Sequence, residues 1–309
     1  MAVQAGTQPG TGSRPAARTR PGPRSRDRSS AGVSRSGILA TTFMFVCAIY
    51  FLLPAWWLVV SSTKSPSTLY ASEGFWFSQL HFVSNLTGLF RYDGGIYWHW
   101  LVNTLLYAGV GALGATLLAS AAGYALAKYE FRGRQLVFSV ILGGVLVPGT
   151  ALALPLYLLL SKVSLTNTYW AVFLPSLVSP FGVFLARVYA AASIPDELIE
   201  AGRIDGASEG RIFRTMALRI MSPALVTMFL FQFVAIWNNF FLPLVMLSNT
   251  RLYPVTLGLY TWNNQYGQAP QLVSYVVIGS LISVIPLVVA FLSLQRFWRS
   301  GLAAGSVQL

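Results

Sequence analysis

Six long apolar stretches constrain this sequence more than any other feature. Each has 19 to 27 residues, enough for a helix rising 1.5 Å per residue to cross a hydrocarbon layer about 30 Å thick. None contains Asp, Glu, Lys, Arg or His, in keeping with a cost of about 2.5–3.5 kcal/mol for a charge at the centre of a membrane helix. The stretches are residues 38–60, 101–127, 136–160, 168–186, 223–247 and 272–294. They predict an all-α polytopic membrane protein with six transmembrane helices.

Composition supports this class, because 55% of the 309 residues are hydrophobic and only 10% are charged. Proline interrupts the third and fourth stretches at Pro148, Pro155, Pro175 and Pro180. Proline removes a helical hydrogen bond and crowds the preceding turn, so these two spans are expected to be kinked or broken.

The basic residues are distributed unevenly between the two sides of the predicted membrane helices. Seventeen of the 21 fall before the first stretch, in the second-to-third and fourth-to-fifth connections, or after the last stretch. The other four are Lys64, Arg91, Lys162 and Arg251. The positive-inside rule then places both termini in the cytoplasm, and it accounts for the net charge of +12 without nucleic acid.

Residues 1–37 differ in composition from the rest of the chain. They are rich in Arg, Pro, Gly and Ser and hold too little apolar surface to form a core. We expect a disordered cytoplasmic tail that sets orientation and aids solubility. Binding to anionic lipid headgroups is the alternative interpretation of its arginines.

Acidic residues gather in the predicted cytoplasmic connection between the fourth and fifth spans. Five of the nine lie between positions 196 and 209, around the segment "ELIEAGRIDGASEGRIF" at 197–213. Pro195 followed by Asp196 and Glu197 is typical of a helix start, since acids are stabilised at the positive end of the helix dipole.

The same segment carries signals for a turn and a second helix. Asp205 and Gly206 predict a break, and Ser208 is a candidate cap for the second helix. The apolar residues of the first helix could share one face; they are Leu198, Ile199, Ala201 and Ile204. A helix, a turn and a second helix with mixed charge predict a plug for a groove on a cytoplasmic partner.

Several motifs in this order resemble one known family. "EAGRIDGAS" at 200–208 is similar to the E-A-A-x-x-D-G-A signature of carbohydrate permeases of ATP-binding-cassette importers, of the maltose-transporter type. "LVNTLLYA" at 101, "PLYLLLSKVSLTNTYWAVFLP" at 155, "SIPDELIEAGRIDGAS" at 193, "WNNFFLPL" at 237 and "GLAAGSV" at 301 also resemble it. The resemblance covers nearly everything after residue 37.

The resemblance implies a subunit of a larger assembly in a bacterial inner membrane. The expected partners are a second permease that completes a heterodimeric pore, two cytoplasmic ATPase subunits that bind ATP and magnesium, and an extracytoplasmic sugar-binding protein. Residues 38–300 would form the permease domain, with a coupling loop at about 193–222, and residues 301–309 a tail that also reaches the ATPases.

In that family the loop forms a coupling helix that sits in a cleft of the ATPase subunit. By this match the contact residues are Glu200, Ala201, Gly202, Asp205, Gly206, Ala207 and Ser208. Two positions depart from the family pattern. Gly202 replaces the second alanine, which weakens an isolated helix by up to about 1 kcal/mol. Arg219 follows Leu218 where the family often has proline, so the junction with the fifth span is not defined by the match.

The sequence offers no catalytic site. None of the three lysines follows glycine, so the G-x-x-x-x-G-K-[ST] phosphate loop is absent and ATP hydrolysis is expected in the partner subunits. No cofactor or metal site is expected, because the lone Cys47 and the two external histidines, His81 and His99, have no ligand partners at membrane depth.

Polar residues inside the spans are candidates for a substrate path. They are Asn103, Gln232, Trp237, Asn238 and Asn239. Amides can share hydrogen bonds with sugar hydroxyls and an indole can stack on a sugar ring, although amides also bond across packed membrane helices without a ligand. In the external connection before the last span, the candidates for contact with the binding protein are Tyr260, Trp262, Asn263 and Tyr266.

Two other classes remain as alternatives. An ion-coupled secondary transporter usually needs an ionisable group at membrane depth, which these spans lack, although sodium held by backbone carbonyls stays open. A membrane assembly protein without transport activity explains six spans but not the charged plug. The sequence does not identify the sugar.

Overall fold

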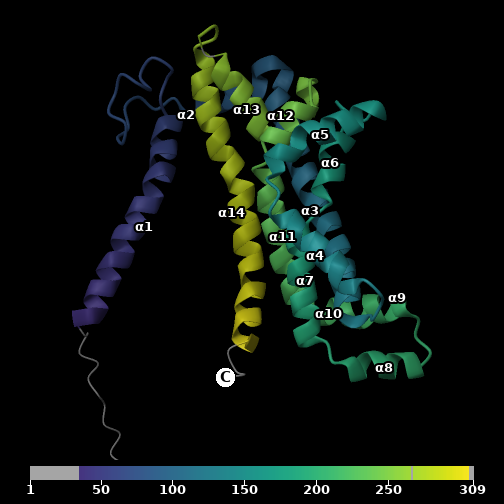
Figure 1. Ribbon diagram of the computed structural model, residues 1–309. Coiled ribbons are helices and arrows are strands. Elements are labelled where there is room, and N and C mark those ends of the chain that lie inside the picture. Colours follow the sequence, from purple (N-terminus) through teal and green to yellow (C-terminus); the bar gives the residue numbers. More distant parts are fainter. Residues whose placement is uncertain (1–34, 266, 306–309) are drawn as a thin grey trace, which may run out of the picture. The chain divides into compact units, whose positions relative to one another are not determined.

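The computed structural model describes residues 35–265 and 267–305 (Figure 1). Every regular element in these two ranges is helical, which confirms the predicted all-α class. The longer helices are α1 (Arg35–Ser62), α2 (Phe82–Arg91), α3 (Ile96–Lys128), α4 (Arg134–Val145), α5 (Gly149–Lys162), α7 (Pro180–Ser193), α8 (Asp196–Ile204), α11 (Ser222–Trp237), α13 (Val255–Asn264) and α14 (Gln271–Gly305). The shorter ones are η1 (Tyr92–Gly95), α6 (Trp170–Ser176), α9 (Glu209–Ile212), η2 (Phe213–Ala217), α10 (Leu218–Ile220), α12 (Phe241–Met246) and η3 (Thr250–Leu252).

The chain divides into two compact units, Met1–Phe51 and Leu52–Leu309. The described part of the first unit is the start of α1. Most of the predicted tail at 1–37 lies outside the described residues. The second unit contains the acidic segment 197–213 and all five residues predicted for a substrate path.

Four helical runs in the described part of the chain are long and apolar enough to cross a membrane. They are Gly37–Ser62, Phe82–Lys128, Trp170–Ser193 and Gln271–Gln295; they contain the first, second and sixth predicted spans and overlap the fourth from Trp170 onward. Two bent helix pairs complete a set of up to six spans, namely Arg134–Val145 with Gly149–Lys162 and Glu209–Ile220 with Ser222–Trp237. Up to six crossings therefore agree with the sequence prediction, two of them by bent pairs.

The third predicted span is broken, as its prolines indicated. Helices α4 and α5 meet at 105° across the segment that contains Pro148, which has an extended backbone and no N–H to continue a helix. By contrast, Pro155 lies inside α5 without ending it. In the fourth span, α6 and α7 are separated by residues 177–179, and Pro180 begins α7.

The fifth predicted span, 223–247, is not one continuous helix. Helix α11 ends at Trp237, and α12 starts only at Phe241. The Asn238 side chain bonds back to the Val234 carbonyl at 2.9 Å, and the Asn239 carbonyl accepts from the Thr256 hydroxyl at 3.2 Å. These bonds satisfy local polar groups outside the helix, so hydropathy alone missed the break.

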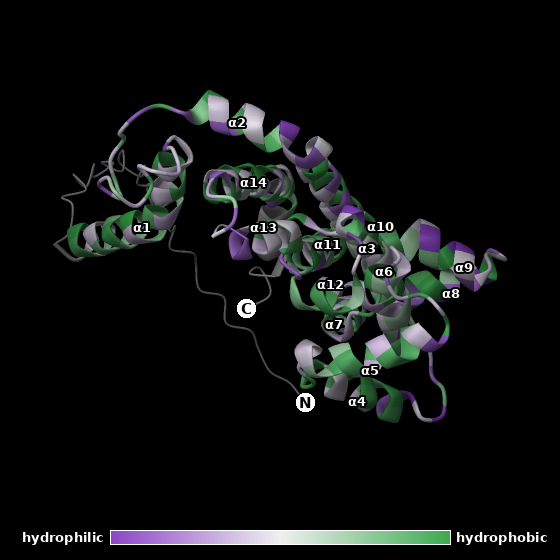
Figure 2. Ribbon diagram, turned by 90° about the horizontal axis from the view of Figure 1, so that it is seen from above, coloured by the Kyte–Doolittle hydropathy of each residue, from purple (hydrophilic) through white to green (hydrophobic). Residues whose placement is uncertain are grey.

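Helices α3 and α7 pack along each other, and α11 packs on both of them. A Cβ atom added at Gly123 of α3 would lie 2.4 Å from Ala186 Cβ and 2.7 Å from Arg187 N, so only glycine permits this approach. Small residues at membrane-helix interfaces allow such close backbone contact. In Figure 2, apolar residues colour much of α4, α5 and α7 green, while purple hydrophilic residues mark α8 and α9.

Candidate functional site

Helix α8 forms where the acidic segment predicted a helix. Pro195 precedes it with an extended backbone, and Asp196 and Glu197 occupy its first turn. At its end Gly206 takes a left-handed conformation with φ of 76°. The Ala207 N–H donates to the Gly202 carbonyl and the Gly206 N–H donates to the Arg203 carbonyl, both at 3.0 Å. This pair of bonds is a Schellman motif, which confirms the predicted turn at Asp205 and Gly206.

Ser208 stands at the start of α9, but its side chain makes no capping hydrogen bond, so the prediction of a side-chain cap is wrong. Its backbone carbonyl accepts instead from the Arg211 N–H at 2.8 Å and from the Ile212 N–H at 3.0 Å. The sequence therefore predicted the residue at which α9 begins, but not the hydrogen bonds that this residue makes.

The predicted single apolar face of α8 is also wrong. Ile199 and Gly202, three residues apart, form the buried side of the helix, whereas Ala201 is exposed and Ile204 is 86% exposed. The reason is that the side of α8 with Ile199 packs against α9, so Ala201 and Ile204, two and five positions after Ile199, point away from it. The Leu198 side chain is partly exposed.

Gly202 packs against its own chain. A Cβ atom at this position would lie 3.2 Å from Ile212 Cγ1 and 3.5 Å from Met216 Sδ, a tight fit. The family departure at Gly202 thus permits α8 to lie close to α9 and η2. Among the seven predicted contact residues, Gly202 is buried inside the loop and is not presented to a partner.

The outward side of α8, which we call the α8 outer face, combines acids with an exposed aliphatic side chain. It consists of Glu197, Glu200, Ala201, Ile204 and Asp205, all of them exposed. Within the described residues, no ion pair involves its three carboxylates. Figure 1 shows α8 at the lower end of the second unit, below α9. Because all five residues of the α8 outer face are exposed, this face is open to another protein.

Two polar tethers hold the loop to the end of α3. Lys128 Nζ donates to the Ile194 carbonyl at 2.5 Å and to Asp196 Oδ1 at 2.8 Å. Glu209 accepts from Arg203 Nε at 2.6 Å and from the Tyr129 hydroxyl at 2.8 Å. Sequence reasoning missed both tethers, because their members at positions 128 and 129 lie far from the loop in the chain.

The second tether is ionised at neutral pH. The hydrogen bond from Arg203, followed by that from Tyr129, holds the pKa of Glu209 below the ordinary carboxyl value. The same bond to Glu209 raises the pKa of Arg203. Burial, and then the bond to Glu209, raises the pKa of Tyr129, so its hydroxyl remains a donor. Arg203 and Glu209 are well exposed, so water screens their attraction and the tether fixes the geometry of the loop more than it stabilises the fold.

An apolar cluster, which we call the loop-anchoring cluster, joins the same loop to the long helices. It contains Tyr124, Ala186, Ala190, Ile194, Ile199, Ile212, Ala217, Met221 and Met228. These residues come from α3, α7, α8, α9, η2 and α11 and from the segments that connect them. A force on α8 would therefore reach three membrane helices through packed side chains.

The junction with α11 explains the departure at Arg219. The chain stays helical through η2 and α10, and Arg219 is exposed on α10. An 81° bend follows, between Ile220 and Ser222, and Pro223 sits in the first turn of α11. A proline in the first turn costs no helical hydrogen bond. The change of direction thus occurs at Met221, and no proline at position 219 is required.

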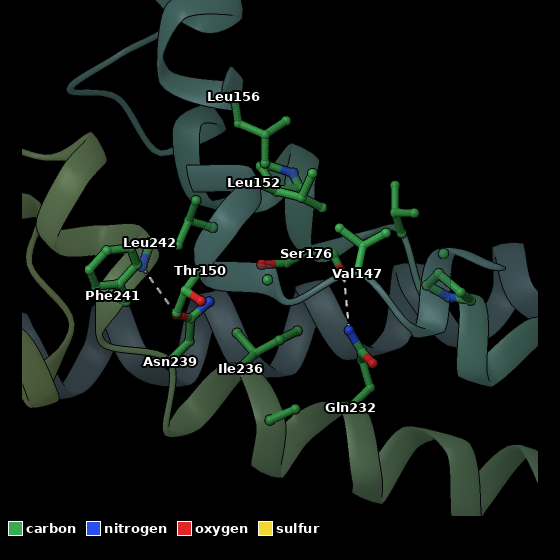
Figure 3. A pocket seen from close by; sticks show the side chains of 16 residues that line it. Val147, Thr150, Leu152, Leu156, Ser176, Gln232, Ile236, Asn239, Phe241 and Leu242 are labelled. Atoms are coloured by element: carbon green, nitrogen blue, oxygen red, sulfur yellow. Dashed lines mark hydrogen bonds between the residues drawn. The ribbon is translucent and has the colours of Figure 1, made fainter. Parts of the chain in front are cut away.

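A cavity of about 610 Å³ opens where three interrupted helices meet (Figure 3). Its wall includes residues beside the α4–α5 break, the α6–α7 break and the α11–α12 break. Four lining residues carry polar side chains, namely Thr150, Ser176, Gln232 and Asn239. Broken helices at membrane depth are tolerated where they line a cavity, and such positions commonly bind substrates.

Of the five residues predicted for a substrate path, two line this cavity. Gln232 also joins helices: its Nε2 donates to the Ser176 carbonyl and its Oε1 accepts from the Ser179 hydroxyl, both at 3.1 Å. Asn239 accepts from the Leu242 N–H at 3.4 Å through Oδ1, and in the described residues its Nδ2 has no hydrogen-bond partner. Asn239 therefore presents a donor to the cavity.

The other three predicted path residues do not line it. Asn103 is buried, donating to the Arg251 and Tyr253 carbonyls and accepting from the Tyr169 hydroxyl. Trp237 is also buried, packed against Phe233 with ring centroids 5.5 Å apart. Asn238 is exposed and bonds only back to Val234 among the described residues. In the described structure, Asn103 and Trp237 therefore contribute to packing between segments of the chain and not to the cavity wall.

The residues predicted to contact the binding protein also include both buried and exposed side chains. Trp262 is 5% exposed and packs against Trp100 with ring centroids 4.5 Å apart, so it is a core residue and the prediction of a surface contact is wrong. Hydropathy and spacing gave no sign that α13 folds back on α3. Tyr260 is exposed beside Phe240, and Asn263 is exposed. Tyr266 lies outside the described residues.

Metal-binding chemistry finds no support in the described ranges. There, no three His, Cys, Asp or Glu side chains come together in a way that could hold an ion. The two features that remain as candidate functional sites are the α8 outer face and the cavity.

Known transport permeases resemble this chain in sequence. Residues 115–302 match the family described as "Binding-protein-dependent transport system inner membrane component". The arabinooligosaccharides transport system permease protein AraQ of Halalkalibacterium halodurans is 38% identical over 70% of this chain and 76% of its own. AraQ of Bacillus subtilis is 31% identical over 91% of this chain and 99% of its own.

The fold also has a solved counterpart. A chain from the crystal structure of a bacterial ABC transporter involved in the import of the acidic polysaccharide alginate matches with a TM-score of 0.74. The two chains are 22% identical, and the match covers 86% of this chain and 98% of the other. At this identity the likeness concerns the fold.

Proposed function

We infer that this chain, which belongs to the family of binding-protein-dependent transport system inner membrane components, is a permease subunit of an ATP-driven importer. It forms half of a translocation pore for a sugar or oligosaccharide. A transport permease is not itself an enzyme, and we assign ATP and magnesium binding to partner subunits.

The observation that carries this proposal is the arrangement of the α8 segment. Its exposed side combines Glu200, Ile204 and Asp205, while its buried side is fixed to α3, α7 and α11 through the loop-anchoring cluster. An exposed helix of this kind, rigidly joined to membrane helices, suits the transmission of a partner's movement to the pore.

The proposed partners follow from this arrangement and from the family. A second permease would complete the pore. One cytoplasmic ATPase subunit would bind the α8 outer face of this chain, and another would bind the corresponding face of the second permease. A sugar-binding protein would deliver the substrate on the opposite side, where Tyr260 and Asn263 are exposed. The relatives named AraQ are permeases for arabinooligosaccharides, which supports an oligosaccharide as the substrate class.

Orientation and domain limits are part of the same proposal. The distribution of basic residues places both termini and α8 in the cytoplasm, with the chain crossing a bacterial inner membrane several times. Residues 38–300 would form the permease domain and 301–309 a tail toward the ATPases; residues 306–309 lie outside the described ranges.

An uptake measurement tests this function against ion-coupled transport. The complete complex is reconstituted into vesicles with ATP inside and its binding protein and radiolabelled oligosaccharide outside. We expect uptake that requires hydrolysable ATP and the binding protein, because the six predicted spans hold no Asp, Glu, Lys, Arg or His for proton coupling. A non-hydrolysable ATP analogue is the control. Uptake driven by a sodium or proton gradient without ATP would refute the proposal.

A further inference from the structure

The wall of the cavity at the three helix breaks carries no charged side chain. Asp, Glu, Lys, Arg and His are all absent from the described residues that line it. Most of the wall is aliphatic, with side chains such as Leu152, Leu156, Ile236 and Leu242. The polar remainder consists of two hydroxyls and two amides.

This composition suits one kind of solute. Hydroxyls and amides both donate and accept hydrogen bonds, which matches a ligand whose hydroxyls do the same. Aliphatic side chains suit the C–H faces between those hydroxyls. The volume of about 610 Å³ falls within the range of roughly 300–1,000 Å³ that is common for small-molecule sites.

A charged solute would lose more hydration energy on entering the cavity than the wall could replace. An ion that leaves water for a low-dielectric wall is stable only if an opposite charge or several strong hydrogen bonds compensate it. This wall offers no counter-charge, and Gln232 is already bonded to Ser176 and Ser179. Gln232 Nε2 keeps one N–H beyond its bond to Ser176, whereas Asn239 Nδ2 has no hydrogen-bond partner among the described residues, so Asn239 offers a ligand the more available amide donor (Figure 3).

We propose that this cavity admits an uncharged, hydroxyl-rich segment of the transported molecule and disfavours an ionised one. The Asn239 side-chain amide then hydrogen-bonds the hydroxyls of that segment. The inference rests on the proposed function in one respect, since it takes the cavity to lie on the transport path. It separates this chain from the similarly folded alginate transporter, which is involved in the import of an acidic polysaccharide.

Thiol chemistry at the cavity wall tests the proposal without measuring transport. Cys47, the only cysteine, is first replaced by serine, and Asn239→Cys is introduced into the complete complex in membrane vesicles. Three methanethiosulfonate reagents of similar size are compared: one carrying hydroxyls, one a quaternary ammonium group and one a sulfonate. Each rate is divided by the rate of the same reagent with a free thiol in water.

We expect the hydroxyl-bearing reagent to react at least about tenfold faster than either charged reagent after this normalisation, because the wall has no counter-charge. Asn263→Cys is the matched control: Asn263 is exposed on α13 and does not line the cavity, so all three normalised rates should be similar. Thr150→Cys, also on the cavity wall, repeats the test if the substitution at position 239 lowers expression.

Three results would overturn the proposal. Equal rates for all reagents at the cavity position would show that its wall does not discriminate charge. A faster reaction of the sulfonate would show that the start of α5 attracts anions. The absence of any reaction, with the control thiol modified, would show that the cavity is closed to hydrated solutes. Loss of ATP-dependent uptake alone would count against the importer proposal and leave these rates unaffected.

Discussion

Replacing Gly206 with valine is expected to reduce coupled uptake by more than tenfold while the protein still inserts into the membrane. Gly206 has φ of 76° and closes α8 through its Schellman motif. The left-handed conformation costs a residue with a side chain about 1–2 kcal/mol of conformational free energy, and it costs a β-branched residue more. A cost of about 2 kcal/mol corresponds to roughly a thirtyfold loss of the correctly folded turn. Uptake and ATP hydrolysis would be measured together on the reconstituted complex.

A control in the same loop isolates the backbone effect. Gly210→Ala places a methyl group where no atom lies within 4 Å, at a helical position of α9, so uptake should be unchanged. A second variant separates docking from folding: Asp205→Lys reverses a charge on the α8 outer face, and a cation near the C-terminal end of a helix does not disturb it. We expect that variant to keep ATPase activity and lose uptake. Normal uptake in both Gly206→Val and Asp205→Lys would contradict the assignment of the loop.

Gly123→Ala is expected to disrupt the packing of α3 on α7, although it adds only one methyl group. The new Cβ would lie 2.4 Å from Ala186 Cβ and 2.7 Å from the Arg187 backbone nitrogen, so the helices must separate. Overpacking of this kind costs about 1–3 kcal/mol. Because Ala186 belongs to the loop-anchoring cluster, uptake should fall together with the melting temperature of the complex in detergent.

The comparison is a second glycine of the same helix. A Cβ at Gly109 of α3 meets no atom within 4 Å, so Gly109→Ala should leave the melting temperature unchanged or raise it through the better helix propensity of alanine, by up to about 1 kcal/mol. If both variants melt at the wild-type temperature, α3 and α7 do not pack closely at Gly123.

Hydropathy and local chain chemistry were sufficient to predict the helices and several of their limits. Uncharged stretches longer than the membrane is thick have few alternatives to a spanning helix, and Pro148 predicted the break between α4 and α5. The start of α8 at Asp196 and its end at Gly206 were predicted too, because capping and left-handed turns depend on neighbouring residues.

Features that depend on tertiary contacts were not predicted. Ile199 and Ile204 are chemically identical, yet one is buried and the other is exposed, because only the path of α9 decides which side of α8 is covered. Trp262 resembled an external aromatic residue until α13 was seen to pack on Trp100. The bonds of Lys128 and Tyr129 to the loop span 66 to 80 residues of sequence and leave no local pattern.

The candidate cavity was only partly visible in the sequence for the same reason. Asn103, Gln232 and Asn239 are all amides within apolar stretches, and nothing local distinguishes them. Asn103 is saturated by carbonyls of the segment that precedes α13 and by Tyr169, whereas Asn239 lies at a helix break that composition did not indicate. Whether an amide serves packing or a ligand depends on what the rest of the chain places around it.

Site-directed crosslinking of the α8 outer face tests most directly whether this chain couples to an ATPase. In a Cys47→Ser background, Ile204→Cys places a thiol where the side chain is 86% exposed, and Ile199→Cys places one where it is 4% exposed. With a short bismaleimide and a transport-active complex whose ATPase subunit carries one introduced cysteine on the surface that faces this loop, we predict a crosslink between the two thiols from position 204 and none from position 199. A complex that imports its substrate normally while position 204 forms no crosslink to the ATPase would contradict the account.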